Sequence, residues 1–240
     1  MEVLPDFEGG SWKVNLDSGF SQVDRGFDFY APQSFLDEKG RRILIGWMGI
    51  PEADYTNPTE KDGWQHALTL PRQLRIKEGR LIQTPLEELK GLRRQQWSFE
   101  RAESFNSAGE MLRRELGPVF EAELQFSDCR SMSLQLRRGT SLTWEDGVLT
   151  LSMEEGGFGR TRRHGALGKL EKLQIFSDVS SLEIFVNGGE QVFSSRVYAD
   201  CGHDGEKTGG YLRLEGDCEA SGTVYRLGGF SVEKRKENDK

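Results

Sequence analysis

The sequence lacks the features that build membrane helices and disulfide-rich folds. No stretch approaches the roughly 18 consecutive apolar residues that a membrane helix needs. Only three cysteines occur, Cys129, Cys201 and Cys218, and none belongs to a Cys-x-x-Cys pair. We therefore predict free thiols, no bound metal and no cofactor, and we interpret the segment Cys201 to Asp204 beside Cys218 as a glycine-containing loop with chance ligands.

Clustered positive charge is lacking as well. The net charge is −7, and Arg and Lys are scattered among acidic residues. Because phosphate binding needs a basic surface, no nucleic-acid partner is expected. The segment Met1 to Asp6 shows no basic region followed by an apolar one, so we predict neither a secretory leader nor a membrane anchor, and the cytoplasm is the expected location.

Long amphipathic helices are also missing, and apolar residues come in short runs separated by turn residues. This pattern predicts an all-β protein. The continuous apolar run 43–48 indicates a strand covered on both faces. In 182–186, Leu182, Ile184 and Val186 alternate with Glu183 and Phe185, which also indicates a strand. Further strands are predicted at 141–144, 148–153, 171–176, 211–215 and 223–227.

Turn chemistry marks two hairpins and one helix. Asn187-Gly188-Gly189 and Glu145-Asp146-Gly147 supply residues that accept the positive φ of tight turns. Thr84, Pro85 and Glu87 have the spacing of a capping box, which predicts a helix at about 85–94. Its buried side would consist of Leu86, Leu89 and Leu92.

Three separated motifs, at 24–49, 63–74 and 180–198, resemble those of glycoside hydrolase family 32, the β-fructosidases. Segments 24–35 and 40–49 are similar to the fifth blade of that family's propeller, and 63–74 resembles its Trp-containing strand ending in Leu-Pro-Arg. Segment 180–198 looks like the signature of its C-terminal domain. The closest likeness is to the bacterial sucrose-6-phosphate hydrolase and invertase branch.

The resemblance implies an all-β chain made of the last blade, and part of the preceding one, of a five-bladed β-propeller followed by a C-terminal β-sandwich. Residues 1–23 would correspond to the end of the fourth blade. The implied division is a partial propeller at 1–83, a linker helix at 84–94, a sandwich at 95–232 and a charged tail at 233–240.

The family's catalytic motifs are not found in this sequence. Retaining glycosidases need two carboxyl groups about 5 Å apart, and the resemblance would place them in Asn-Asp-Pro and Glu-Cys, with a further Asp in Arg-Asp-Pro. Asn57-Pro58 lacks the intervening Asp, and every cysteine follows an aspartate. We therefore predict no catalytic residue, and no turnover by this chain alone.

Asp28, Tyr30 and Trp47 are the predicted substrate-binding residues, because the resemblance brings their strands to the sugar pocket. Two alternatives stay open: Asp28 satisfies strand-end amides, and Trp47 belongs to the core. Trp64 and His66 are weighed between the pocket and ordinary packing.

Four further residues carry structural interpretations. Glu183 and Arg196 are predicted to form a cross-strand charge pair. Trp97 and Trp144 would offer a flat platform for glycans, although burial is the more frequent fate of such residues.

Three functions fit these motifs. The chain is part of a hydrolase acting on sucrose, sucrose 6-phosphate or fructans, with the missing blades supplied elsewhere; or it is a noncatalytic carbohydrate-binding or protein-interaction module; or it is an inactive folded remnant. A fructoside and the missing N-terminal propeller half are the expected partners. Self-association is predicted too, because an incomplete propeller leaves strand edges unpaired.

Overall fold

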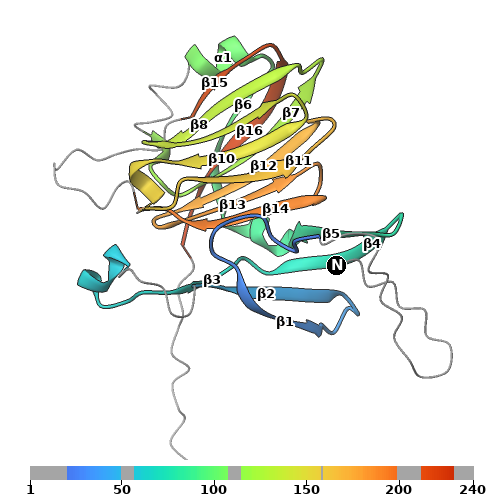
Figure 1. Ribbon diagram of the computed structural model, residues 1–240, viewed down its shortest axis with the longest axis vertical. Coiled ribbons are helices and arrows are strands. Elements are labelled where there is room, and N and C mark those ends of the chain that lie inside the picture. Colours follow the sequence, from blue (N-terminus) through green and yellow to red (C-terminus); the bar gives the residue numbers. More distant parts are fainter. Residues whose placement is uncertain (1–20, 50–56, 108–114, 158, 199–211, 230–240) are drawn as a thin grey trace, which may run out of the picture.

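The computed structural model describes residues 21–49, 57–107, 115–157, 159–198 and 212–229 (Figure 1). These residues form antiparallel strands arranged in three sheets. The all-β prediction is confirmed. The predicted charged tail 233–240, the segment Cys201 to Asp204 and residues 1–20 lie outside the described residues.

The N-terminal sheet is a meander in the order β1-β2-β4-β5, with the short β3 beside β2. Ile43, Leu44 and Met48 of β2 are buried, as expected for a strand covered on both faces. Every residue of the outermost strand β1 is exposed. The strands are β1 (Tyr30–Leu36), β2 (Arg42–Met48), β3 (Ala67–Leu68), β4 (Arg72–Lys77) and β5 (Arg80–Pro85).

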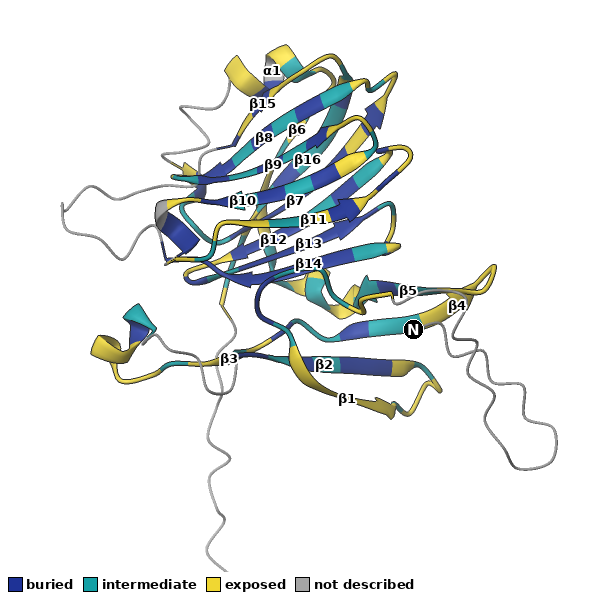
Figure 2. Ribbon diagram, viewed as in Figure 1, coloured by how far each residue is buried: buried dark blue, intermediate teal, exposed yellow. Residues whose placement is uncertain are grey.

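The remaining strands form two packed sheets, here called the two-layer region. The long sheet has the order β14-β13-β12-β7-β16-β6 and the short sheet the order β11-β10-β9-β8-β15. Their facing side chains form one apolar core, and buried residues mark both sheets in Figure 2. Such face-to-face packing is the arrangement expected of a β-sandwich. The strands are β6 (Arg93–Phe99), β7 (Phe120–Ser127), β8 (Ser131–Arg137), β9 (Thr140–Glu145), β10 (Val148–Met153), β11 (Arg162–Ala166), β12 (Lys172–Asp178), β13 (Ser181–Val186), β14 (Gln191–Arg196), β15 (Arg213–Glu215) and β16 (Glu219–Leu227).

Both predicted hairpins are present. Val186 pairs with Gln191 across the β13–β14 turn, where Asn187, Gly188 and Gly189 all have positive φ. Asp146 and Gly147 also have positive φ between β9 and β10. The turn chemistry thus fixes the register of these strands.

The predicted linker helix differs from what forms. A 3-10 helix, η3 (Glu87–Leu92), begins after Leu86 and has no side-chain cap. Thr84 instead pairs with Gln73 in the β4–β5 ladder, so the capping-box prediction is wrong: strand pairing takes the residue that would have capped the helix. Leu89 is half-buried and packs against a small cluster of Phe176, Phe185 and Val192.

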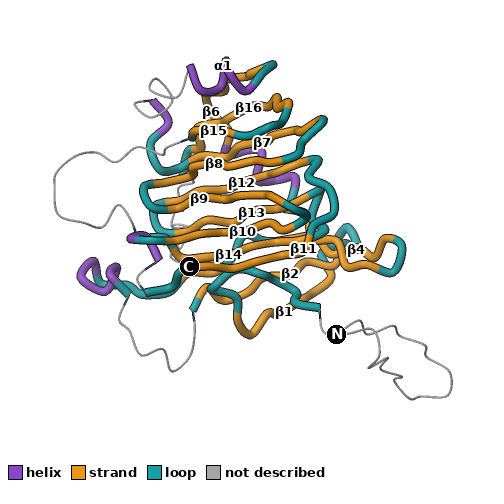
Figure 3. Tube along the Cα trace, turned by 45° about the horizontal axis from the view of Figure 1, so that its top comes forward, coloured by secondary structure: helices purple, strands orange, loops and turns teal. Residues whose placement is uncertain are grey.

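The other helices are short: η2 (Pro58–Asp62), α1 (Ala102–Ser107) and η4 (Glu155–Gly157). Among the residues described, no helix is long and apolar enough to cross a membrane. The N-terminal sheet lies beside β14, the edge strand of the long sheet, as Figures 1 and 3 both show. Residues from all three motifs meet at the junction between these two parts.

Candidate functional site

The segment before β1 covers the open edge of β14. The amide of Arg25 donates to the Val192 carbonyl at 2.7 Å, and the amide of Asp28 donates to the Ser194 carbonyl at 3.0 Å. The Asp28 carboxylate accepts the Arg196 amide at 2.7 Å. Backbone groups of an edge strand are thereby satisfied, which removes a site of unwanted strand pairing.

Asp24 likewise satisfies polar groups of β14, at Ser194, two residues before Arg196. One of its carboxylate oxygens accepts the Ser194 amide at 2.8 Å, and the other accepts the Ser194 hydroxyl at 2.8 Å. Gly26 lies so close to the Ser194 backbone that an added Cβ would overlap it. This contact explains in steric terms why a glycine occupies position 26 in the motif.

Arg72, from the Leu-Pro-Arg motif, is fully buried at the centre of the junction. Its guanidinium lies 2.9 Å from the carboxylate of Asp24 and 2.8 Å from that of Glu183. It also donates to Gln83 and to the hydroxyl of Ser194. A single arginine therefore joins the three motifs, one from the start of the chain, one from β4 and one from the β13–β14 hairpin.

The electrostatics of this junction are those of a buried ionic cluster. Burial raises the pKa of Glu183, whereas Arg72 and the amide of Leu70 oppose that shift. Burial disfavours the charged guanidinium of Arg72, yet Glu183 and Asp24 more than compensate, so the pKa of Arg72 is raised. The charges stabilise one another only while all three stay together.

The predicted pair between Glu183 and Arg196 is wrong. The β13–β14 register places Glu183 opposite Ser194 and Arg196 opposite Ser181. Glu183 instead pairs with Arg72 of β4, in the N-terminal sheet. Residue order within the β13–β14 hairpin does not indicate a partner from a different sheet.

Arg196 instead holds the segment between β2 and β3 against the two-layer region. Its guanidinium donates to the carbonyl and hydroxyl of Ser180, both at 3.0 Å, and to the carbonyl of Gln65. It also lies 5.0 Å from the ring centroid of Trp64. Trp64 is accordingly a packing partner that remains partly exposed.

Tyr30, Trp47 and His66 form an aromatic cluster on the N-terminal sheet. The rings of Trp47 and His66 are stacked with centroids 4.8 Å apart, and Tyr30 meets Trp47 edge-on at 5.9 Å. Trp47 is half-buried and Tyr30 is 49% exposed. A partly exposed aromatic cluster of this kind offers ring surface to the C–H groups of a sugar.

An irregularity in β1 aims Tyr30 at this cluster. The β1–β2 register shifts between Tyr30 and Gln33, and Ala31 has a φ of 43°. A bulge of this kind redirects a neighbouring side chain and is frequent beside functional sites. Of the predicted binding residues, the structure thus brings Tyr30 and Trp47 together.

Asp28 lies at the junction rather than in the cluster. Its side chain is buried, and its carboxylate is engaged by the Arg196 amide and the Arg160 guanidinium. These contacts correspond to the structural alternative weighed for this residue. Sugar contact by Asp28 stays a prediction.

The two tryptophans of the two-layer region pack inward. Trp144 is buried in the shared core, and its indole donates to the Leu167 carbonyl at 2.8 Å. Trp97 is half-buried and packs against the same core. Neither ring forms an open platform.

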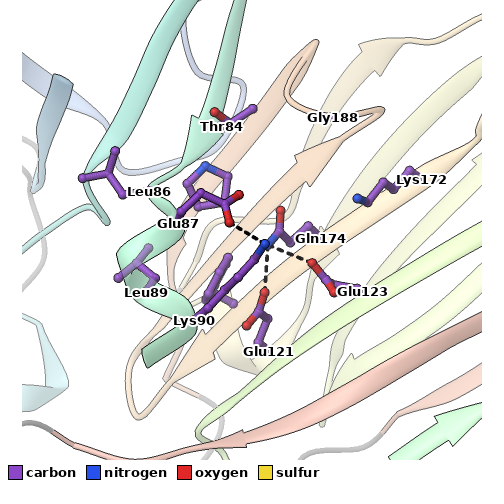
Figure 4. Close-up of a pocket in the computed structure, with 12 residues that line it drawn as sticks. Thr84, Leu86, Glu87, Leu89, Lys90, Glu121, Glu123, Lys172, Gln174 and Gly188 are labelled. Carbon is purple, nitrogen blue, oxygen red and sulfur yellow. Dashed lines mark hydrogen bonds and ion pairs between the residues drawn. The ribbon is translucent and has the colours of Figure 1, made fainter. Parts of the chain in front are cut away.

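A pocket of about 160 Å³ opens where η3 meets the outer face of the long sheet (Figure 4). Lys90 and Glu87 form an ion pair at its rim. Gln174 donates to Glu121 at 2.7 Å on the sheet side. The main polar and aromatic side chains of the lining are Lys90, Glu121, Glu123, Lys172, Gln174 and Phe176.

This lining has charges of both signs, and they lie close together. Arg93 binds Glu121 with contacts of 2.7 and 2.6 Å, which offsets its negative charge. Neither a phosphate nor a divalent cation would therefore meet a strong field of one sign. Within the described ranges, no group of three or more His, Cys, Asp or Glu side chains is placed to hold a metal ion.

Sequence reasoning missed the joint role of Asp24, Arg72 and Glu183. The signal is present in the sequence, because each of these residues lies inside one of the three motifs. Only the fold shows that the motifs meet.

Two family models match consecutive parts of the chain. The Glycosyl hydrolases family 32 N-terminal domain matches residues 3–85, and the Glycosyl hydrolases family 32 C terminal model matches residues 88–221. Among curated proteins, the sucrose-6-phosphate hydrolase of Staphylococcus xylosus is 40% identical over 204 residues, covering 79% of this chain and 40% of the relative. The chain thus spans less than half the length of that relative.

Solved structures show the same relationship. The β-fructofuranosidase of Bombyx mori superimposes with a TM-score of 0.66 at 29% identity, over 93% of this chain and 45% of that one. The sucrose-6-phosphate hydrolase of Lactobacillus gasseri shares the fold, with a TM-score of 0.69 at 24% identity over 86% of this chain and 42% of that one. On the two model matches and these likenesses, the chain belongs to glycosyl hydrolase family 32.

Proposed function

We propose that this chain is the C-terminal portion of a β-fructosidase that acts on sucrose, sucrose 6-phosphate or fructans. In this proposal it contributes one aromatic wall of the fructoside pocket, and a preceding part of the enzyme contributes the catalytic carboxylates. The family membership supports the reaction class, and the names of the relatives support the sugar class. The chain alone is then a sugar-contacting half without turnover.

The aromatic cluster of Tyr30, Trp47 and His66 is the observation that carries this proposal. Tyr30 belongs to β1, whose seven residues are all exposed, and Trp47 pairs with it from β2. The N-terminal sheet has the meander order of a propeller blade, so we assign it as the last blade of a five-bladed propeller. A preceding blade would then cover the exposed β1 side and close the pocket over the cluster.

The proposed division of the chain follows the sequence-based boundaries. Residues 1–83 are the partial propeller, 84–94 the linker, 95–232 the sandwich and 233–240 a charged tail. A cytoplasmic location belongs to the same proposal.

Fructose release by the purified chain tests the assignment of the catalytic groups. Incubation with sucrose, sucrose 6-phosphate and short fructans should yield no fructose above the buffer rate, because a retaining mechanism needs two carboxyl groups in one pocket. Sustained turnover by the chain alone would refute the proposal that its catalytic groups lie elsewhere.

Calorimetry tests the proposed wall. Titration with sucrose and short fructans should give heat that Tyr30→Ala weakens at least threefold, because the variant removes an exposed ring from the cluster. Phe35→Ala is the matched control, since Phe35 is 50% exposed on the same strand and Tyr30 is 49% exposed. Equal loss in both variants, or no heat with any sugar, would count against the wall.

The pocket beside η3 supports a second candidate function, a noncatalytic carbohydrate-binding module. Lys172, Gln174 and Phe176 alternate along β12 and therefore share one face. Together they add a donor, an amide and an aromatic ring to the lining of one cavity, in which Figure 4 labels Lys172 and Gln174. A neutral polyol uses all three, because its hydroxyls both donate and accept hydrogen bonds while its C–H groups contact the ring.

Lys172→Met separates this candidate from the aromatic wall. The variant should weaken sugar binding if the sugar binds in the pocket beside η3. It should leave sugar binding unchanged if the sugar binds at the aromatic cluster of Tyr30, Trp47 and His66. Lys169→Met is the control, because Lys169 lies outside the pocket and pairs with Glu171 on the surface. A loss shared by both lysine variants would exclude the pocket as the cause.

A further inference from the structure

Two cysteines lie at equivalent corners of the two-layer region. Cys129 occupies the turn between β7 and β8, and Cys218 the turn between β15 and β16. Each turn carries the chain between the long and the short sheet, because β7 and β16 belong to the long sheet and β8 and β15 to the short one. The cysteines are far apart in sequence, yet both turns lie at the same end of the fold.

Strand register places the two turns opposite each other. Ser127 pairs with Glu219 on the long sheet, and Ser133 pairs with Glu215 on the short sheet. Between these pairs, the amide of Arg130 donates to the Asp217 carbonyl at 2.8 Å. The two turns are thus held in contact by backbone as well as by sheet pairing.

The thiols of Cys129 and Cys218 lie close enough that each affects the pKa of the other. The Cys129 thiol also donates to the Ser131 carbonyl at 3.8 Å. Both side chains are half-buried and pack against the apolar core of the two-layer region. Both are free thiols in the structure. The fold therefore holds two reduced thiols on facing turns at the rim of the core.

We propose that Cys129 and Cys218 are an oxidative modification site, at which a low-molecular-weight disulfide such as oxidised glutathione converts the two thiols into one intramolecular disulfide. The bond would fasten the β7–β8 turn to the β15–β16 turn. It would add a covalent tie between connections that otherwise rely on hydrogen bonds and the exposed Arg130–Asp217 ion pair.

The exchange proceeds in two balanced steps. A thiolate of the pair attacks one sulfur of oxidised glutathione, forms a mixed disulfide and releases one glutathione thiolate. The second protein thiolate attacks the protein sulfur of that mixed disulfide and releases the second glutathione. Two protein thiols are oxidised, one glutathione disulfide is reduced to two thiols, and each protein thiol gives up one proton.

Burial governs how fast this exchange runs. It raises the pKa of the Cys129 thiol to about 12, and it raises the pKa of Cys218 as well. Because the thiolate is the attacking species, oxidation at neutral pH is slow. Its rate should continue to rise as the pH increases from 8 to 10, whereas a cysteine with an ordinary pKa of about 8.5 would reach a plateau.

Intact-mass spectrometry of the folded chain tests the site. Incubation with oxidised glutathione at pH 9 should lower the mass by about 2 Da, because two hydrogens leave as the disulfide forms. Nonreducing peptide mapping should then assign the bond to Cys129 and Cys218. The oxidised chain should melt several degrees higher than the reduced chain, because the crosslink closes a long loop in the unfolded state.

Serine variants give the controls. Cys201→Ser should keep the mass loss and the melting shift, whereas Cys129→Ser and Cys218→Ser should abolish both. Should a serine variant fail to fold, peptide mapping of the unmutated chain still decides. Two unmodified thiols after prolonged incubation, stable glutathione adducts alone, or a bond that includes Cys201 would each overturn the proposal.

Discussion

Arg72 and Glu183 form an ion pair of 2.8 Å that is buried on both sides, and it joins β4 of the N-terminal sheet to β13 of the long sheet. Asp24 completes the cluster from the segment before β1. The family motifs in this chain are therefore first of all a structural clamp. The clamp fixes the N-terminal sheet, which carries Tyr30 and Trp47, against the two-layer region.

Replacing the central cation should disrupt this clamp. Arg72→Met leaves two carboxylates buried without a counter-charge, so we expect a loss of about 3 to 5 kcal/mol in the free energy of unfolding. Urea unfolding followed by tryptophan fluorescence measures the change. Arg75→Met is the control, because Arg75 is exposed on the same strand and bonds only Gln73 among the described residues.

The Arg75 variant should stay within about 0.5 kcal/mol of the unmutated chain. A similar small effect for Arg72→Met would show that the cluster contributes little to the junction.

A second prediction concerns the close approach of Gly26 to β14. Gly26→Ala places a Cβ against the Ser194 backbone, which is fixed in the β13–β14 hairpin. The segment must move away, so we expect a loss of about 1 to 3 kcal/mol in the free energy of unfolding. Thermal unfolding by circular dichroism provides the measurement.

Gly91→Ala is its matched control, because no atom lies within contact distance of a Cβ at position 91. That variant should be neutral or slightly stabilising. Equal melting temperatures for both alanine variants would argue that the 24–28 segment does not depend on its contact with β14.

The strand segments and the two hairpin turns that the sequence predicted depend on local signals, and they form in the structure. Positive φ at Asn187 and Gly188 follows from the residue types themselves, and the apolar run 43–48 required a covered strand. Side-chain partners depend on which sheets meet, which periodicity does not encode. The local pattern therefore predicts a partner for Glu183 within its own hairpin, whereas its partner in the structure comes from β4.

In the candidate site, too, contacts within one sheet follow from the sequence, whereas contacts between sheets do not. Tyr30 and Trp47 are cross-strand neighbours in the β1–β2 ladder, so strand pairing alone brings them together. Asp28 belongs to the same motif, but it precedes β1 and its carboxylate turns to the Arg196 amide. A sequence motif therefore does not indicate which of its residues contact a ligand and which contact a neighbouring strand.

The third prediction concerns pH and the surface cluster around Glu88. The Arg41 and Lys39 side chains lower the pKa of Glu88 from 4.5 to about 2. A carboxylate with a lowered pKa stabilises the fold above pH 4.5, and that contribution is lost as the pH falls toward 2. Carbon-detected NMR titration of the Glu88 carboxyl should therefore show a midpoint near 2.

Arg41→Met should shift this midpoint back toward 4.5, because Arg41 is the largest cause of the lowering. A midpoint near 4.5 in the unmutated chain would mean that the contacts of 2.8 and 3.0 Å between Arg41 and Glu88 do not persist in solution.

The last prediction concerns the exposed side of the N-terminal sheet. In the described part of the chain, β1 pairs with β2 on one edge and with no strand on the other. Phe35 and Leu36 are 50% and 59% exposed there. An open strand edge with apolar side chains favours association, so we expect light scattering to show dimers or larger species whose fraction grows with concentration.

Phe35→Glu should shift the chain toward the monomer, because a charge on this surface is costly to bury between two copies. Val179→Glu is the control, since Val179 is 57% exposed in the turn between β12 and β13, away from β1. If association persists in Phe35→Glu and falls in Val179→Glu, the contact lies on the two-layer region instead. A concentration-independent monomer in the unmutated chain would show that β1 is covered within one copy, and the proposed approach of a preceding blade to that strand would lose its structural basis.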